Sequence, residues 1–218
     1  MKFRYLTFDC YGTLVDWRKG IEMGLRSALG DLRLQGRELL DAYVSAERDQ
    51  EESYVKYREV LKRSAISLSK PLGVAVPARA AEEFAASVPE WPAFPDTRDF
   101  LKAAGKMGYK RYILSNVDDD LLEGTIANNG LEVDGYVTAE QVGSYKPKEG
   151  HWLEFMKRTG AAKGEFLHVA QSLFHDIVPT TRMGIASAWV NRYNEKLVSG
   201  ADPTIIADSL ESLSKLLD

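Results

Sequence analysis

The chain has 218 residues, a formal net charge of −4 at pH 7 and a single cysteine, Cys10. This length suffices for one large domain or for a core domain that carries an insert. The absence of a basic block speaks against a nucleic-acid partner, and one cysteine excludes an internal disulfide or a cysteine-based metal cluster. No apolar run is long enough to span a membrane and no signal-peptide pattern opens the chain, so the expected location is the cytoplasm.

The first predicted element is a buried strand that ends at Asp9. Residues 3–8 form a short, β-prone apolar run, which stops at this acid and is followed by a glycine turn. Ligands of open α/β sheets bind beyond the carboxyl ends of the strands, so Asp9 is the candidate centre of a site. The alternative is that Asp9 only caps the turn. Cys10 beside it could be a thiol nucleophile, but a small buried filler is the favoured interpretation.

Helical spacing replaces strand-like alternation in residues 16–91, which predicts an inserted all-helical cap domain over Asp9. Three prolines between residues 89 and 95 favour a stiff return linker, which we expect beside residues 15–17 as the hinge of the cap. A helical subdomain that never moves is the alternative. Apolar stripes predict helices around residues 21–29, 39–46, 54–61 and 78–88, with a break at 70–73.

Strands and helices alternate in the remainder of the chain. This alternation is typical of a mostly parallel, doubly wound, Rossmann-like α/β sheet. Residues 1–15 and 92–218 are therefore predicted to form the core domain, and residues 16–91 the cap. Strands are expected over 111–114, 135–138, 166–170, 185–190 and 204–207, and helices over 97–104, 119–127, 150–158, 180–183 and 210–217.

Polar residues follow each of the next three predicted strands, where they could meet Asp9. A hydroxyl and backbone N–H groups at such a place can bind a carboxylate or a phosphate, although a Ser-Asn pair also suits a helix cap. A lone lysine in a loop is often a solvated charge, and a histidine at a helix start is often a packing residue. The candidates are Ser115 and Asn116 after the second strand, Lys146 after the third, and Gln171, His175 and Asp176 after the fourth.

The string DCYGT, from Asp9 to Thr13, resembles the opening motif of the haloacid dehalogenase superfamily, in which the matching Asp is a carboxylate nucleophile. Phosphatases of the superfamily carry a second Asp, the general acid and base, where this chain has Tyr11. A leaving alkoxide needs a proton from an acid whose pKa is near the operating pH, and a tyrosine, with a pKa of about 10, is poorly matched. A halide leaves without a proton. Asp-x-Tyr-Gly-Thr is the pattern of the L-2-haloacid dehalogenase branch.

The resemblance implies a role for each candidate. Lys146 matches the lysine that keeps the nucleophile ionised, and Thr13 would help to orient Asp9. Ser115, Asn116 and the backbone around Tyr11 would bind the substrate carboxylate. Asp176 would activate the hydrolytic water.

A magnesium site is not expected. Magnesium-dependent members have an Asp where this chain has Gln171, because Mg²⁺ usually recruits more than one carboxylate. Since the acids at Tyr11 and Gln171 are both missing, we predict an enzyme that uses no metal and no cofactor.

The chain also departs from the dehalogenase branch. Members of the branch have Ser where Gln171 stands, Asn where Leu173 stands and Tyr where Trp152 stands. The arginine thought to receive the halide has no clear counterpart, and Arg48 is the nearest candidate. Gln171 or His175 could replace the residues that place the water.

The expected function is hydrolytic dehalogenation of short 2-haloalkanoic acids through an aspartyl-ester intermediate on Asp9. A magnesium-dependent phosphatase of a small phosphate ester is the first alternative. A non-catalytic member that binds a small acid or a protein is the second. Dimers are usual in the branch that the chain resembles, so a homodimer is possible.

Overall fold

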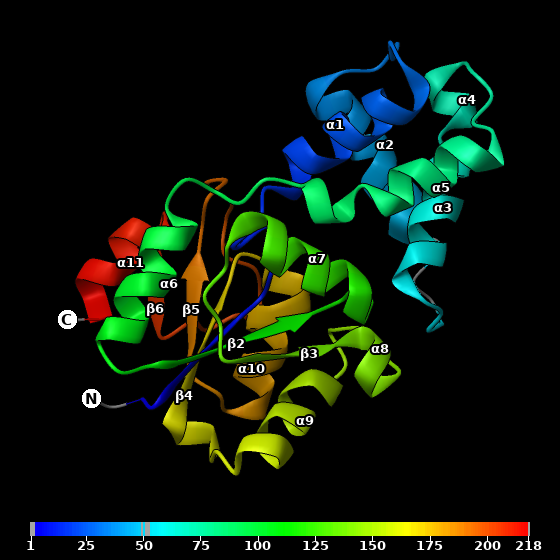
Figure 1. Ribbon diagram of the computed structural model, residues 1–218. Helices are drawn as coiled ribbons and strands as arrows, with labels where there is room; N and C mark the ends of the chain where they lie inside the picture. The colour runs from blue at the N-terminus through cyan, green and yellow to red at the C-terminus, as the bar shows by residue number, and fades with distance from the viewer. Residues whose placement is uncertain (1–2, 49, 51–52, 218) are drawn as a thin grey trace. The chain divides into compact units, whose positions relative to one another are not determined.

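The computed structural model describes residues 3–48, 50 and 53–217 (Figure 1). The chain divides into two compact units, which we call the α/β unit and the helical unit. The predicted domains differ from this division at residue 92 and at residues 117–129, which group with the helices, and the domain boundaries stay a prediction. The α/β unit comprises Met1–Val15, Ala93–Asn116 and Gly130–Asp218, and the helical unit comprises Asp16–Pro92 and Val117–Asn129.

The α/β unit is built on a sheet that, in the described residues, has six strands in the order β3-β2-β1-β4-β5-β6. Every pairing is parallel, which confirms the expected doubly wound α/β architecture. β1 lies between β2 and β4, so the carboxyl ends of these strands meet where Asp9 stands. The strands are β1 (Tyr5–Phe8), β2 (Lys110–Ser115), β3 (Gly135–Thr138), β4 (Phe166–Ala170), β5 (Ser187–Val190) and β6 (Ile205–Ala207).

Helices cover both faces of this sheet (Figure 1). Side chains alternate between the faces along a strand, and β1 shows which helix covers which face. The ring of Phe8 packs edge-on against Phe100 of α6 (Thr97–Lys106), whereas the ring of Tyr5 packs edge-on against Phe155 of α9 (Gly150–Thr159). Thr7 has the parity of Tyr5 and therefore points toward the α9 side. The helices of this unit are α6 (Thr97–Lys106), α8 (Ala139–Val142), α9 (Gly150–Thr159), α10 (Val178–Met183) and α11 (Leu210–Leu217), with the short turns η2 (Lys163–Glu165) and η3 (Leu173–Ile177).

The helical unit forms its core from the apolar stripes that the sequence shows. Buried side chains from several of its helices include Leu25, Leu39, Val60 and Phe84. The unit consists of α1 (Trp17–Leu29), α2 (Gly36–Arg48), α3 (Tyr57–Ser67), α4 (Ser69–Leu72), α5 (Ala78–Ala86), η1 (Val88–Glu90) and α7 (Asp119–Asn129). None of the helices in the described part of the chain is long and apolar enough to cross a membrane.

Two local expectations in this unit are wrong. The third helix begins at Tyr57 rather than near residue 54, because the carboxylate of Asp118 accepts hydrogen bonds from the backbone N–H groups of Tyr57 and Arg58, at 2.8 and 2.9 Å. The predicted break at residues 70–73 contains most of the helical turn α4, since a proline is tolerated in the first turn of a helix. Gly73 then ends this turn with a φ of +68°.

The two crossings between the units lie side by side, as predicted. Val15 and Ala93 form an antiparallel bridge, and the N–H of Phe94 donates to the carbonyl of Leu14 at 2.9 Å. On the other side of this bridge, the N–H of Asp16 donates to the carbonyl of Pro92 at 2.9 Å. A hinge at this place stays a prediction.

Candidate active site

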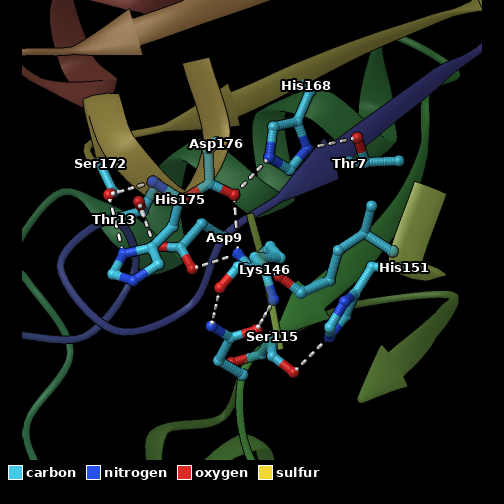
Figure 2. A network of polar contacts seen from close by, with 12 residues as sticks. Thr7, Asp9, Thr13, Ser115, Lys146, His151, His168, Ser172, His175 and Asp176 are labelled. Carbon is cyan, nitrogen blue, oxygen red and sulfur yellow. Dashed lines mark hydrogen bonds and ion pairs between the residues drawn. The ribbon is translucent and has the colours of Figure 1, made fainter. Parts of the chain in front are cut away.

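Asp9 lies at the end of β1 with both carboxylate oxygens engaged. Its side chain is almost completely buried. Oδ1 accepts a hydrogen bond from Lys146 Nζ at 2.8 Å, and Oδ2 accepts one from Thr13 Oγ1 at 2.9 Å (Figure 2). The structure therefore brings Lys146 to Asp9 and Thr13, from which it is distant in sequence. The three side chains meet at the edge of the sheet where the sequence predicts a site.

Lys146 also joins Asp9 to Asp176. Its Nζ donates to Oδ1 of Asp176 at 2.7 Å and to the carbonyl of Leu114 at 2.9 Å, so each of its three protons has an acceptor. Burial lowers the pKa of Lys146, but the charges of Asp176 and Asp9 outweigh it, and the net pKa lies above the ordinary value. The lysine is a buried ammonium shared by two carboxylates.

The two carboxylates have pKa values that move in opposite directions. Burial and the charge of Asp176 raise the pKa of Asp9, against the opposing effect of Lys146 and Thr13. Burial also acts to raise the pKa of Asp176, but Lys146 and His168 outweigh it and hold the pKa well below the ordinary value. Asp176 is therefore the carboxylate that stays ionised most firmly, and Asp9 is the one more easily protonated.

The side chain of Asn116 holds the backbone of Lys146 in position. The side-chain Nδ2 of Asn116 donates to the carbonyl of Lys146 at 3.0 Å, and its Oδ1 accepts from the N–H of Lys146 at 2.7 Å. This reciprocal pair occupies both ends of the amide. The predicted substrate-binding role of Asn116 is untested, and the contacts give the side chain a positioning role in the loop that carries the lysine.

Ser115 keeps its hydroxyl available. Its Oγ is buried and has no hydrogen-bond partner among the described residues, while its carbonyl contacts His151 Nε2 at 3.0 Å. A carbonyl only accepts, so His151 Nε2 carries the proton. Burial, together with the charge of Lys146, lowers the pKa of His151 to about 3, so this ring is neutral at pH 7.

Gln171 extends the network on the side of Thr13. Its backbone N–H donates to Thr13 Oγ1 at 2.9 Å, which links the turn after β4 to Asp9. The side-chain Nε2 of Gln171 donates to Oε2 of Glu195 at 3.0 Å, and the backbone carbonyl of Gln171 accepts from Trp189 Nε1 at 2.9 Å. Glu195 was not predicted, because nothing in its surrounding sequence marks an exposed loop acid as a partner of this turn.

His175 is partly buried in the π-helical turn η3. Its backbone N–H donates to Ser172 Oγ at 3.0 Å, and its ring Nδ1 lies 3.1 Å from the same hydroxyl. Burial lowers the pKa of His175 to about 4, although the charge of Asp176 opposes this shift. The imidazole is therefore neutral at pH 7, and its proposed part in placing water is untested.

The sequence prediction missed several members of the network, which include Thr7, His151, His168 and Ser172. His168, in the middle of β4, contacts Asp176 Oδ1 through Nε2 at 2.9 Å, and its Nδ1 lies 2.9 Å from Thr7 Oγ1 (Figure 2). The available signal is an ionisable residue inside the apolar run FLHVA, because a buried histidine needs partners for its ring nitrogens.

The other predicted residues differ in their burial. Trp152 is fully buried in the core beside Tyr5, and its ring packs edge-on against His168. Tyr11 is partly exposed in the turn after Asp9. Arg48 is exposed at the end of α2 in the helical unit. Cys10 is buried and burial raises its pKa well above the ordinary value, which supports the interpretation as an inert filler.

A family model for haloacid dehalogenase-like hydrolases matches residues 3–177. The match covers most of the chain and includes Asp9, Lys146 and Asp176. The chain therefore belongs to the haloacid dehalogenase-like hydrolase family, as its DCYGT motif predicts. Comparison with curated protein sequences finds no significant match.

Several solved structures have the same fold. The L-2-haloacid dehalogenase from Xanthobacter autotrophicus has 19% sequence identity and a TM-score of 0.86, covering 99% of this chain and 98% of that chain. The structure of that enzyme with chloropropionic acid covalently bound matches at 19% identity and a TM-score of 0.80, with 99% and 98% covered. The putative hydrolase YfnB from Bacillus subtilis, bound to magnesium, matches at 21% identity and a TM-score of 0.85, with 100% of both chains covered. At these identities the likeness establishes the fold.

The donor set fits magnesium poorly. Among the described residues, no group of three or more His, Cys, Asp or Glu side chains could hold a metal ion. Mg²⁺ needs hard oxygen ligands in octahedral geometry. Asp9 and Asp176 each already give one oxygen to Lys146, and Gln171 stands where a further carboxylate would be needed. Activity without a metal stays a prediction.

Proposed function

We propose that this hydrolase removes the halogen from short 2-haloalkanoic acids by covalent catalysis on Asp9. The observation that carries the proposal is the state of the Asp9 carboxylate. Lys146 and Thr13 each donate to one of its oxygens, and a tyrosine, Tyr11, stands two residues later where an acid would be needed to protonate an alkoxide. An aligned carboxylate without such an acid suits a leaving group that departs as a stable anion.

In the first step an oxygen of Asp9 attacks the carbon that bears the halogen. The new carbon–oxygen bond forms as the carbon–halogen bond breaks, and the halide leaves with the electron pair and with inversion of the carbon. Lys146 and Thr13 orient the attacking group. The substrate carboxylate docks near the hydroxyl of Ser115, which has no partner in the described part of the chain, and near the turn at Tyr11.

In the second step water attacks the carbonyl carbon of the Asp9 ester. A proton of this water passes to Asp176, the ester bond breaks on the side of Asp9, and the released oxygen takes up the proton to give the 2-hydroxy acid. Gln171 and His175 lie on the turn that carries Asp176 and would help to place the water. The product oxygen comes from Asp9, which regains an oxygen from water and releases the second water proton to solvent.

The similar structures support this assignment by analogy of fold. One of them is an L-2-haloacid dehalogenase, and another holds chloropropionic acid in a covalent bond. The alternative is a magnesium-dependent phosphatase, since a hydrolase of the same fold is described as bound to magnesium. The poor fit of the donor set to magnesium favours dehalogenation.

The deciding experiment measures halide release from each enantiomer of 2-chloropropionate with a chelator present, beside p-nitrophenyl phosphate hydrolysis with Mg²⁺. We expect halide release from one enantiomer and no phosphatase activity. Asp9→Asn should abolish the turnover, and Asp16→Asn, at the N-cap of α1, serves as the matched control. In multiple turnovers in ¹⁸O-labelled water, the peptide with Asp9 should gain the label.

Two outcomes would contradict the proposal. Phosphate release that depends on Mg²⁺, without halide release, would assign the protein to the phosphatases. Full turnover by Asp9→Asn would show that the nucleophile is a different residue. Five further expectations stay predictions. Substrate-bound structures would test the cap over the site, halide binding by Arg48 and a substrate contact of Trp152. Light scattering would test the homodimer, and cell fractionation would test the cytoplasmic location.

A further inference from the structure

His168 is a fully buried imidazole that links two strands to Asp176. It stands on β4 in register with Thr7 on β1 and with Ser187 on β5. Its side chain has the parity of Phe166 and therefore lies on the same face of the sheet as Trp152, whose ring it contacts at 5.3 Å between centroids. A buried polar ring among aromatic residues is stable only if its nitrogens are hydrogen-bonded.

The partners of the ring assign its tautomer. Oδ1 of Asp176 belongs to an ionised carboxylate and can only accept, so Nε2 of His168 carries a proton and donates it at 2.9 Å. Nδ1 lies 2.9 Å from Oγ1 of Thr7, a hydroxyl that can donate or accept, so this contact satisfies the second ring nitrogen. The carboxylate of Asp176 therefore selects the ring form with a proton on Nε2, in the way that hydrogen-bond partners set histidine tautomers elsewhere.

This contact leaves one oxygen of Asp176 unused. Oδ1 receives two hydrogen bonds, from Lys146 Nζ at 2.7 Å and from His168 Nε2. Oδ2 is buried and has no hydrogen-bond partner in the described part of the chain. A buried anionic oxygen without a partner is costly, and it is the free acceptor of this carboxylate. Lys146 also donates to Asp9, so both carboxylates lie within hydrogen-bonding distance of a single nitrogen (Figure 2).

We propose that His168 is a positioning residue for the second step of the reaction: it holds Asp176 through Oδ1, so that Oδ2 accepts the proton of the hydrolytic water. This inference rests on the proposed function. In the step itself water attacks the ester carbonyl of Asp9 and one water proton moves to Oδ2, while His168 keeps its own proton. Without His168, Oδ1 would be held by Lys146 alone, and the carboxylate could turn and offer either oxygen to the ammonium.

The proposal separates the two chemical steps. Attack by Asp9 depends on Lys146 and Thr13, whereas hydrolysis of the ester depends on Asp176. In His168→Phe we expect ester hydrolysis to slow roughly tenfold or more, the value of a hydrogen bond to a charged group, and ester formation to change by less than about threefold. The ester should therefore accumulate. Acid-quenched samples from single and multiple turnovers of 2-chloropropionate, analysed by mass spectrometry of the intact protein, measure both rates.

Three further variants make the test specific. His168→Gln retains an N–H donor and should recover part of the hydrolysis rate. Thr7→Val removes only the distant partner of the ring and should have a smaller effect in the same direction. Ser187→Ala is the matched control, because Ser187 flanks His168 in the sheet and its Oγ has no hydrogen-bond partner among the described residues. The acid limb of the hydrolysis rate should move to higher pH in His168→Phe, which a purely structural role would not produce.

The outcomes distinguish this inference from the proposed function. If the wild-type protein forms no ester, the proposed function fails, and the role of His168 in hydrolysis fails with it. If the wild-type protein turns over through the ester but His168→Phe slows both steps equally, only the role of His168 is wrong.

The tautomer can be tested without turnover. The chain has three histidines, so ¹⁵N NMR of the rings, assigned with the His168→Gln variant, can resolve each one. We expect a proton on Nε2 of His168, with a resonance that shifts in Asp176→Asn. A ring protonated at Nδ1 alone would overturn the inference.

Discussion

The two units of the chain satisfy their carboxylates in different ways. In the α/β unit, Asp9 and Asp176 share the ammonium of Lys146. In the helical unit, Glu47 accepts only from the hydroxyl groups of Tyr43 and Tyr57 in the contacts that the structure defines, at 3.0 and 2.7 Å.

The consequences for ionisation differ accordingly. Burial raises the pKa of Glu47, and the two hydroxyls offset this only in part. The cation beside Asp176 instead outweighs burial and holds the pKa of that carboxylate low. Neutral donors leave the pKa of Glu47 raised, whereas Lys146 and His168 together hold the pKa of Asp176 low. Asp9 shares the same cation, but burial and the charge of Asp176 still raise its pKa.

The largest effect should come from removing the shared cation. Lys146→Met leaves Asp9 and Asp176 buried without a counter-ion, so we expect a loss of halide release of more than about 1,000-fold and a loss of unfolding free energy of about 3–5 kcal/mol. Steady-state kinetics and urea denaturation measure the two effects. Lys148→Met, at an exposed lysine two residues on, is the control and should leave both unchanged. Retained turnover in Lys146→Met would refute the pairing.

Thr13→Val should have the next largest effect. The substitution keeps the shape of the side chain but removes the donor to Asp9 Oδ2 and the acceptor for the N–H of Gln171. We expect kcat to fall about 10- to 100-fold, as for the loss of a hydrogen bond to a charged group. Thr97→Val also removes a buried hydroxyl, one that donates to the carbonyl of Leu14, and should lower stability without a comparable fall in kcat. Equal kinetic effects of the two variants would argue against a role for Thr13 in orienting Asp9.

Acid should destabilise the protein well before Asp176 is protonated. The pKa of His151 is lowered to about 3 in the folded chain, against about 6.5 when unfolded. Between these values the unfolded chain binds the proton and the folded chain does not, so the free energy of unfolding falls as the pH drops below about 6.5. Urea titrations from pH 7 to pH 4 measure this slope. The slope should be shallower in His151→Asn, and an unchanged slope would exclude His151 as its source.

The smallest effect is expected in the helical unit. Because the folded-state pKa of Glu47 is raised, its charge costs stability as the pH rises through that pKa, and Glu47→Gln removes this cost while keeping an acceptor for both hydroxyls. We expect a change in unfolding free energy of less than about 1 kcal/mol at pH 7. Urea denaturation at pH 5 and pH 7 tests it. A loss as large as that of Lys146→Met would show that Glu47 is held as a charge.

Much of the site could be predicted from the sequence because its parts lie at strand ends. A buried strand ending in Asp9 and later strands followed by Lys146 and Asp176 must bring these side chains to one edge of a parallel sheet. The helical insert followed from apolar spacing in the same way. Both inferences depend on patterns of apolar residues that are close together along the chain, and the period of such a pattern indicates which side chains are buried.

The residues that were missed depend on contacts between distant segments. Thr7 and His168 are 161 residues apart in sequence and meet only because β1 and β4 pair in one register. Asp118 caps α3 from 60 residues away, so the start of that helix was misjudged. The sequence predicts Asn116 as a substrate-binding residue, and only the structure shows its two hydrogen bonds to the backbone of Lys146.

The sequence by itself determined the family, the alternation of elements and the identity of the candidate nucleophile, because each is encoded by residues that are neighbours along the chain. Only the tertiary structure decided which donor each carboxylate oxygen contacts and which histidine contacts Asp176. The physical reason is that hydrogen bonds act over about 3 Å, and partners at that distance are chosen by strand order and register.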